Sequence, residues 1–171
     1  MKTALLLIDL QNDYLPDGRF PLWNTAPVID ATVDAIALAQ QRDMLVVHIQ
    51  HVSQSPEGDG AFFIAGTGGV KIHPRILAAA PEAPVVVKQF ADAFHQTALE
   101  ALLSRHGVQR LLVAGMMTQN CVTHTAISKA AEKYQVGVLA DCTTTVSQPI
   151  HQIALHGLST RVPLLMSADA F

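Results

Sequence analysis

The chain has 171 residues, of which half are hydrophobic and 15% are charged, so it is long enough to bury most of its surface in one folded domain. Its net charge is −3 and no run of Lys or Arg occurs, which argues against nucleic acid as a partner. Asp9 interrupts the first apolar run and polar side chains interrupt the stretch 111–128, so we expect neither an export signal nor a membrane span.

Apolar runs alternate along the chain with segments of helical periodicity, which is typical of parallel strands joined by helices. The runs predicted to form strands are, in chain order, Ala4–Asp9, Met44–Gln50, Val85–Lys88, Arg110–Ala114, Gln135–Ala140 and Val162–Met166. We therefore expect residues 1–171 to form a single α/β domain, a Rossmann-like three-layer sandwich with a central parallel sheet of about six strands.

The segments between these strands carry helix signals. The first helix starts at Asn24 or Thr25, has Pro27 in its first turn, and turns apolar residues inward. Those inward residues are expected to be Val28, Ile29, Val33, Ile36 and Leu38. The other predicted helices run from Pro74 to before Pro81, from His95 to His106, from Cys121 to about Tyr134, and from Pro149 to Leu158. Ser53–Gly69 holds five glycines and a proline, so it is predicted to be a long functional loop that covers the site.

Three chemically distinct side chains follow three of the predicted strands. Asp9 closes the first strand, Lys88 closes the third, and Cys121 lies between the fourth strand and a helix. Because parallel strands end at the same edge of a sheet, an acid, an amine and a thiol should meet there. Backbone N–H groups and the helix dipole at a strand-to-helix junction favour a thiolate. Singly, each residue is more simply explained as a cap, a solvated charge or a buried thiol, but together they predict a hydrolase site.

Three motifs in register resemble the isochorismatase-like cysteine hydrolases, a family that includes nicotinamidases and N-carbamoylsarcosine amidohydrolase. These motifs are Asp9-Leu-Gln-Asn-Asp13, Lys88, and Gly-Met-Met-Thr-Gln-Asn-Cys-Val-Thr-His-Thr-Ala at 115–126. The segment from Phe62-Phe63 to Ile72-His73-Pro74 is also similar, so the resemblance covers nearly the whole chain.

The resemblance implies a role for each residue of the three motifs. Cys121 is the nucleophile that attacks a C–N bond through a thioester, Asp9 accepts and returns its proton, and Lys88 holds Asp9 and favours the thiolate. A cis peptide is implied between Met116 and Met117, so that the N–H groups of Met117 and Cys121 form an oxyanion hole. His124, one turn after Cys121, is the alternative base.

The resemblance predicts neither a metal nor another cofactor in this chain. Nicotinamidases of the family bind zinc or iron through an Asp-x-His pair after the second strand, and here His51 and Ser53 stand at those two positions. His48 and His51 are three residues apart and so should face opposite sides of the strand, although His73 could approach from the loop. Without the carboxylate, these histidines match a catalytic metal site poorly.

The substrate is expected to be a small amide, carbamoyl or ureido compound. Candidate substrate-binding residues are Gln11, Trp23, Phe62, Phe63 and Thr118, although each aromatic ring could pack in the core or an interface instead. The apolar composition predicts a homo-oligomer, and a reactive thiol with only two cysteines in the chain favours the reducing cytoplasm. Cys142 is expected to be structural. The alternatives are a metal-dependent nicotinamidase-type enzyme and a non-catalytic oligomeric or ligand-binding protein that retains the fold.

Overall fold

The computed structural model describes residues 1–53 and 61–171. All six strands are parallel and follow the order β3-β2-β1-β4-β5-β6. This order is the doubly wound arrangement of Rossmann-like folds, and it confirms the predicted α/β class. The strands are β1 (Thr3–Ile8), β2 (Leu45–His51), β3 (Val85–Lys88), β4 (Arg110–Met116), β5 (Gln135–Thr144) and β6 (Leu164–Leu165).

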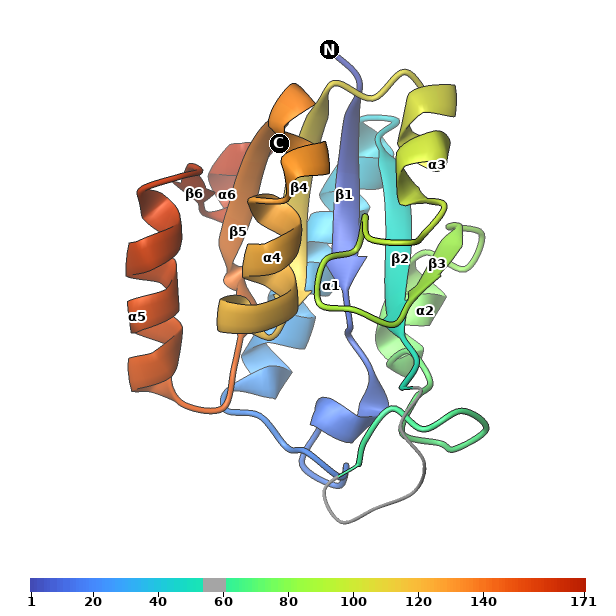
Figure 1. The fold of residues 1–171 in the computed structure, drawn as a ribbon, viewed down its shortest axis with the longest axis vertical. Coiled ribbons are helices and arrows are strands. Elements are labelled where there is room, and N and C mark those ends of the chain that lie inside the picture. Colours follow the sequence, from blue (N-terminus) through green and yellow to red (C-terminus); the bar gives the residue numbers. More distant parts are fainter. Residues whose placement is uncertain (54–60) are drawn as a thin grey trace.

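Helices cover both faces of the sheet, which gives the three predicted layers (Figure 1). One face is covered by α1 (Thr25–Gln41), α2 (Pro74–Ala79) and α6 (Ser167–Ala170), whose apolar residues pack with Leu5 and Leu7 of β1. The other face is covered by α3 (Leu99–Arg105), α4 (Thr123–Ala126) and α5 (Gln148–Ser159), with Leu6 and Ile8 among the residues of that core. β1 is therefore buried on both sides, which explains its unbroken apolar sequence.

Two predicted helices differ from the observed ones. The helix predicted over His95–His106 begins only at Leu99, because Gln96 has a left-handed backbone (φ 55°) that a helix cannot include. The predicted helix from Cys121 to Tyr134 is divided into α4 and the 3₁₀ turn η3 (Lys129–Lys133). Ser128 between them has a non-helical backbone (ψ 144°), and its Oγ accepts a hydrogen bond from the Ala130 N–H, so it caps a new turn.

Strand lengths also differ from the predicted ones. β5 continues to Thr144, beyond the predicted end at Ala140, because it pairs with β4 again after an irregular stretch between Val138 and Thr143. The last strand contains only Leu164 and Leu165. The sequence did not predict α6 or the short 3₁₀ turn η1 (Asn12–Tyr14).

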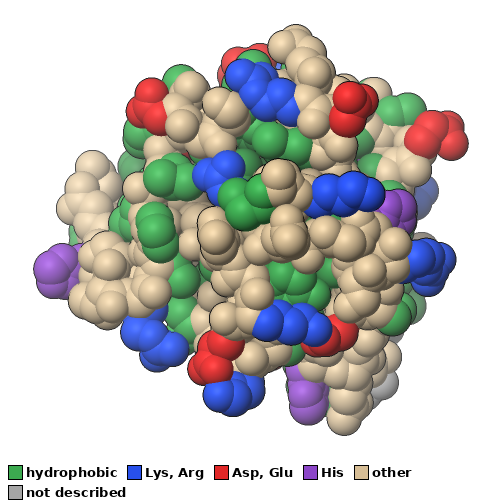
Figure 2. Space-filling view, turned by 90° about the horizontal axis from the view of Figure 1, so that it is seen from above, with side chains coloured by type: hydrophobic (Ala, Val, Ile, Leu, Met, Phe, Trp, Pro, Cys, Tyr) green, Lys and Arg blue, Asp and Glu red, His purple; other side chains and the backbone are tan. Residues whose placement is uncertain are grey.

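The face at the amino ends of the strands carries interspersed basic and acidic side chains (Figure 2). No helix within residues 1–53 and 61–171 has the length and apolar character needed to cross a membrane.

Candidate active site

The topology places Asp9, Lys88 and Cys121 at one edge of the sheet. Asp9 follows β1, Lys88 ends β3, and Cys121 lies in the π-helical turn η2 (Thr118–Val122) that follows β4. β1 and β4 are the neighbours at which the strand order reverses, the position where doubly wound sheets bind ligands. Gly115 makes this approach possible, since its φ is +125° and a Cβ there would lie 2.0 Å from the Ile8 carbonyl oxygen.

The Lys88 ammonium is the centre of the cluster. Its Nζ lies 2.8 Å from Asp9 Oδ2 and donates to Cys121 Sγ over 3.2 Å. Asp9, Lys88 and Cys121 expose 0%, 1% and 3% of their surface, so water screens these charges little. The predicted meeting of an acid, an amine and a thiol is therefore confirmed, whereas their catalytic roles stay a proposal.

The predicted thiolate is not the resting state that this environment favours. Burial and the negative charge of Asp9 raise the pKa of the Cys121 thiol far above its ordinary value, and the Lys88 charge offsets only part of the rise. Burial alone lowers the pKa of the Lys88 ammonium, but the charge of Asp9 and the hydrogen bonds of Lys88 to Asp9 and Cys121 outweigh burial and raise it. Burial and Asp9 therefore oppose the effect predicted from the helix dipole, which acts here from a turn of only five residues.

The backbone before Cys121 has the form that the resemblance implied. The Met116–Met117 peptide bond is cis. The N–H groups of Asn120 and Val122 both donate to the Met117 carbonyl, at 3.0 and 3.3 Å. Within residues 1–53 and 61–171 the Met117 N–H itself donates to no acceptor, so it is available as the predicted oxyanion donor.

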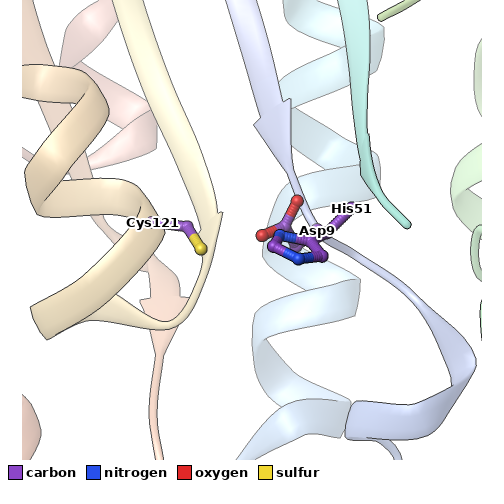
Figure 3. Close-up of side chains that lie close together, drawn as sticks. All are labelled: Asp9, His51 and Cys121. Atoms are coloured by element: carbon purple, nitrogen blue, oxygen red, sulfur yellow. The ribbon is translucent and has the colours of Figure 1, made fainter. Parts of the chain in front are cut away.

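His51 is the site residue that the sequence placed in another role. Its side chain lies beside the Asp9 carboxylate, and Cys121 Sγ points toward both (Figure 3). His51 Nδ1 is 3.0 Å from Lys88 Nζ, and burial followed by the Lys88 charge lowers the pKa of the imidazole. The only sign of this contact in the sequence was that His51 directly follows the predicted strand that precedes the strand ended by Lys88.

Gln11 ties the loop after β1 to the end of β2 beside the site. Its Nε2 donates to the carbonyls of His51 and Val70, at 2.9 and 2.7 Å, and its Oε1 accepts from the His51 N–H over 2.8 Å. The side chain is fully buried. Both donors of the amide and one acceptor position of its oxygen are used by the backbone, and contact of Gln11 with substrate stays a prediction.

Trp23 and Thr118 meet at His151 of α5. The Thr118 hydroxyl and His151 Nδ1 lie 2.8 Å apart, and the Trp23 and His151 ring centres are 5.9 Å apart. Burial lowers the pKa of His151. These three side chains form a group beside η2, and their contact with substrate stays a prediction.

Phe62 and Phe63 belong to an aromatic cluster with Tyr14 and Phe20. Phe62 stacks on Phe20 with centres 4.8 Å apart, and Phe63 packs edge-on to Tyr14 at 4.6 Å. The Phe63 N–H donates to Asp13 Oδ2 over 2.6 Å, and its carbonyl accepts from the Ser53 N–H. This part of the predicted covering loop is therefore anchored. Residues 54–60 of that loop lie outside the described residues.

The donor atoms around Lys88 do not fit a metal ion. Ligand atoms of Asp9, His51 and Cys121 lie within 4.8 Å of one another, which is the spacing of a metal site. Lys88 Nζ, however, contacts Asp9 Oδ2, His51 Nδ1 and Cys121 Sγ, so a second cation at their centre must displace a buried ammonium.

The other histidines weighed as ligands or as a base have separate partners. His48 faces away from His51, as the odd spacing predicted, with Nε2 2.9 Å from the Ala80 carbonyl oxygen. His73 caps α2, accepting from the Arg75 N–H. The exposed His124 has its Nδ1 2.9 Å from the Asn120 carbonyl oxygen, which argues against it as the base. Cys142 is fully buried, and burial raises its pKa to about 12, consistent with a structural thiol.

Residues 3–170 match the family model described as the isochorismatase domain. An uncharacterised isochorismatase family protein of Bacillus subtilis (strain 168) is 36% identical over 150 residues, covering 86% of this chain and 81% of that protein. Maleamate amidohydrolase of Pseudomonas putida (strain KT2440) is 31% identical over 174 residues, covering 94% and 80%. The crystal structure of an isochorismatase-like hydrolase from Alkaliphilus metalliredigens superposes with a TM-score of 0.87 at 25% identity, covering 98% and 96%. The chain belongs to the isochorismatase family of hydrolases.

Proposed function

We propose that this enzyme hydrolyses a C–N bond in a small amide, carbamoyl or ureido compound, with Cys121 Sγ as the nucleophile. One observation carries the proposal: a single buried ammonium, Lys88 Nζ, contacts both the Asp9 carboxylate and the Cys121 sulfur. A thiol beside a buried base and a fixed cation is the arrangement of a covalent hydrolase. The similarity to maleamate amidohydrolase supports an amide as the substrate.

Because burial and the Asp9 charge raise the pKa of the Cys121 thiol, its deprotonation is part of the proposed chemical step. Asp9 accepts the thiol proton as Sγ attacks the substrate carbonyl carbon, and the Lys88 charge compensates the negative charge of sulfur. Asp9 then returns this proton to the leaving nitrogen as the C–N bond breaks, which leaves a thioester on Cys121. Such positioned proton transfers contribute about 10²- to 10⁴-fold to a rate.

Hydrolysis of the thioester uses the same groups in reverse. Asp9 accepts a proton from water as the water oxygen attacks the thioester carbon. The C–S bond breaks, the product leaves as a carboxylic acid, and Sγ recovers the proton from Asp9. The Met117 and Cys121 N–H groups stabilise the oxyanion in both halves, and one such donor is worth about 2.7–4 kcal/mol at the transition state.

The test is the Cys121→Ala variant, with Cys142→Ala as the matched control because it alters the other thiol of the chain. Ammonia release is screened over small primary amides, carbamoyl and ureido compounds. Cys121→Ala should lose all turnover while the control keeps it, and mass spectrometry of the quenched wild-type reaction should find an acyl group on Cys121. Turnover by well-folded Cys121→Ala, once a substrate is found, contradicts the proposal.

The proposal includes a homo-oligomer in a reducing compartment such as the cytoplasm. The edge strand β3 exposes about half of Val85 and Val87, and Phe90 beside it is also exposed, so an apolar surface lies along the edge of the sheet. A thiol nucleophile must also remain reduced to act. Light scattering at micromolar concentration tests the assembly, and a monomer there contradicts it.

A further inference from the structure

The Lys88 ammonium has more contacts than hydrogens. Four acceptor atoms lie around Nζ: Asp9 Oδ2 at 2.8 Å, His51 Nδ1 at 3.0 Å, the Phe90 carbonyl oxygen at 3.1 Å and Cys121 Sγ at 3.2 Å. An ammonium offers three N–H donors and no acceptor. The ammonium cannot donate to all four atoms at once, so its position between Asp9 and Cys121 depends on which of these acceptors are held in place.

His51 is held more rigidly than a surface histidine. Its backbone exchanges two hydrogen bonds with the buried amide of Gln11, and it is the register partner of Lys88 in the β2–β3 pair. The Phe63 ring lies against the imidazole, with centres 5.8 Å apart. The imidazole is thus a preorganised acceptor, whereas Lys88 is a flexible four-carbon chain with rotatable donors.

The contact with Lys88 also defines the protonation state of the imidazole. Because Lys88 can only donate, Nδ1 must accept, so the ring is neutral and its proton is on Nε2. A protonated ring would put two cations about 3 Å apart in a buried site. The lowered pKa of His51 agrees with this neutral state.

We propose that His51 is a positioning residue, whose neutral Nδ1 holds the Lys88 ammonium between Asp9 and Cys121. Only the turnover measurement below rests on the proposed function; the alkylation measurement does not. If His51 is replaced by an apolar residue, Lys88 loses a fixed acceptor, and its charge is no longer held against the developing negative charge on sulfur.

The test uses three variants of one position. In His51→Asn the amide oxygen is as many bonds from Cβ as Nδ1 is, so it restores an acceptor near the same point. His51→Gln places its amide farther out, near the Nε2 position, and His51→Leu has no acceptor. His106→Asn and His106→Leu, at an exposed position at the end of α3, are the matched controls.

The first measurement needs no substrate: the iodoacetamide alkylation rate of Cys121 at pH 7–9, followed by peptide mapping. His51→Leu and His51→Gln should react about 10- to 100-fold more slowly than wild type, the range expected when a hydrogen bond to a charged group is lost. His51→Asn should recover at least half of this loss on a logarithmic scale, and both His106 variants should match wild type.

The second measurement is turnover of the amide. His51→Leu should lower kcat about 10- to 100-fold while KM changes less than about threefold, and His51→Asn should restore kcat. Circular dichroism checks the fold, and His51→Gln replaces His51→Leu if the latter does not fold. Unchanged or faster alkylation in both His51→Leu and His51→Gln overturns the inference, as does an Asn variant as slow as they are. If Cys121→Ala keeps its turnover, the proposed function fails, but the alkylation result still decides the role of His51.

Discussion

Asp9 and Lys88 form a fully buried ion pair, 2.8 Å long, across the end of a strand to which neither belongs. Asp9 follows β1 and Lys88 ends β3, and β2 lies between these two strands in the sheet. The pair can form because all three strands end at the same edge. It brings the base and the cation of the proposed reaction together.

Asp9 and Lys88 should change the reactivity of Cys121 in opposite directions. The Asp9 charge raises the thiol pKa and the Lys88 charge lowers it, so Asp9→Asn should be alkylated faster than wild type at pH 7–8 and Lys88→Met more slowly. Each pKa unit changes the thiolate fraction about tenfold. Turnover should nevertheless fall in both variants, by about 10²- to 10⁴-fold in Asp9→Asn, because the proton acceptor is lost. Slower alkylation of Asp9→Asn is the result that contradicts this electrostatic account.

Replacing one partner of the ion pair should lower the free energy of unfolding more than replacing both partners. Lys88→Met leaves a buried carboxylate without its cation and should lower the free energy of unfolding by about 3–5 kcal/mol. The double variant Asp9→Asn with Lys88→Met should recover part of that loss, because no unpaired charge remains. Urea unfolding of the four proteins in this cycle measures the effect. A double variant as unstable as the sum of both single variants disagrees with it.

Folding stability should decrease as the pH falls below about 6.5. His48 is buried between β2 and the residue after α2, and burial lowers its pKa. The unfolded chain, whose histidines titrate near 6.5, therefore binds protons at a higher pH than the folded chain does. His51, His73 and His151 have lowered pKa values too and add to the same trend.

His48→Gln isolates one contribution, because the glutamine amide can still donate to the Ala80 carbonyl but does not titrate in this range. Between pH 7.5 and 5.5 its stability should decrease by about 1 kcal/mol less than that of wild type, since one proton contributes at most about 1.4 kcal/mol per pH unit. His156→Gln, an exposed position on α5, is the control and should follow wild type. Equal pH dependence of His48→Gln and wild type argues against the contribution of His48.

Removal of metal ions should leave the activity unchanged. The Lys88 ammonium already contacts Asp9, His51 and Cys121, the group with metal-ligand spacing among residues 1–53 and 61–171, so a metal bound by these three side chains must displace it. Exhaustive chelation followed by the amide assay measures this, with the same assay after zinc addition as the control. Activity that is lost on chelation and restored by zinc or iron contradicts this prediction and points to His51 as a ligand.

The sequence by itself determined the sheet and the three residues at its edge. Buried parallel strands are apolar over their whole length, so runs such as Ala4–Ile8 and Leu111–Ala114 are visible without any knowledge of their neighbours. The polar residue that ends each run then lies at the carboxyl edge, which is why the meeting of Asp9, Lys88 and Cys121 could be predicted.

The tertiary structure decided what those residues contact and how they titrate. The raised pKa of the Cys121 thiol comes from burial and from Asp9, which is 112 positions away in the chain, and no local pattern reports either effect. Gln11 is committed to the backbone, and His51 to Lys88, because β1, β2 and β3 end side by side in space. Periodicity describes one segment at a time, whereas these hydrogen bonds and charges act between segments.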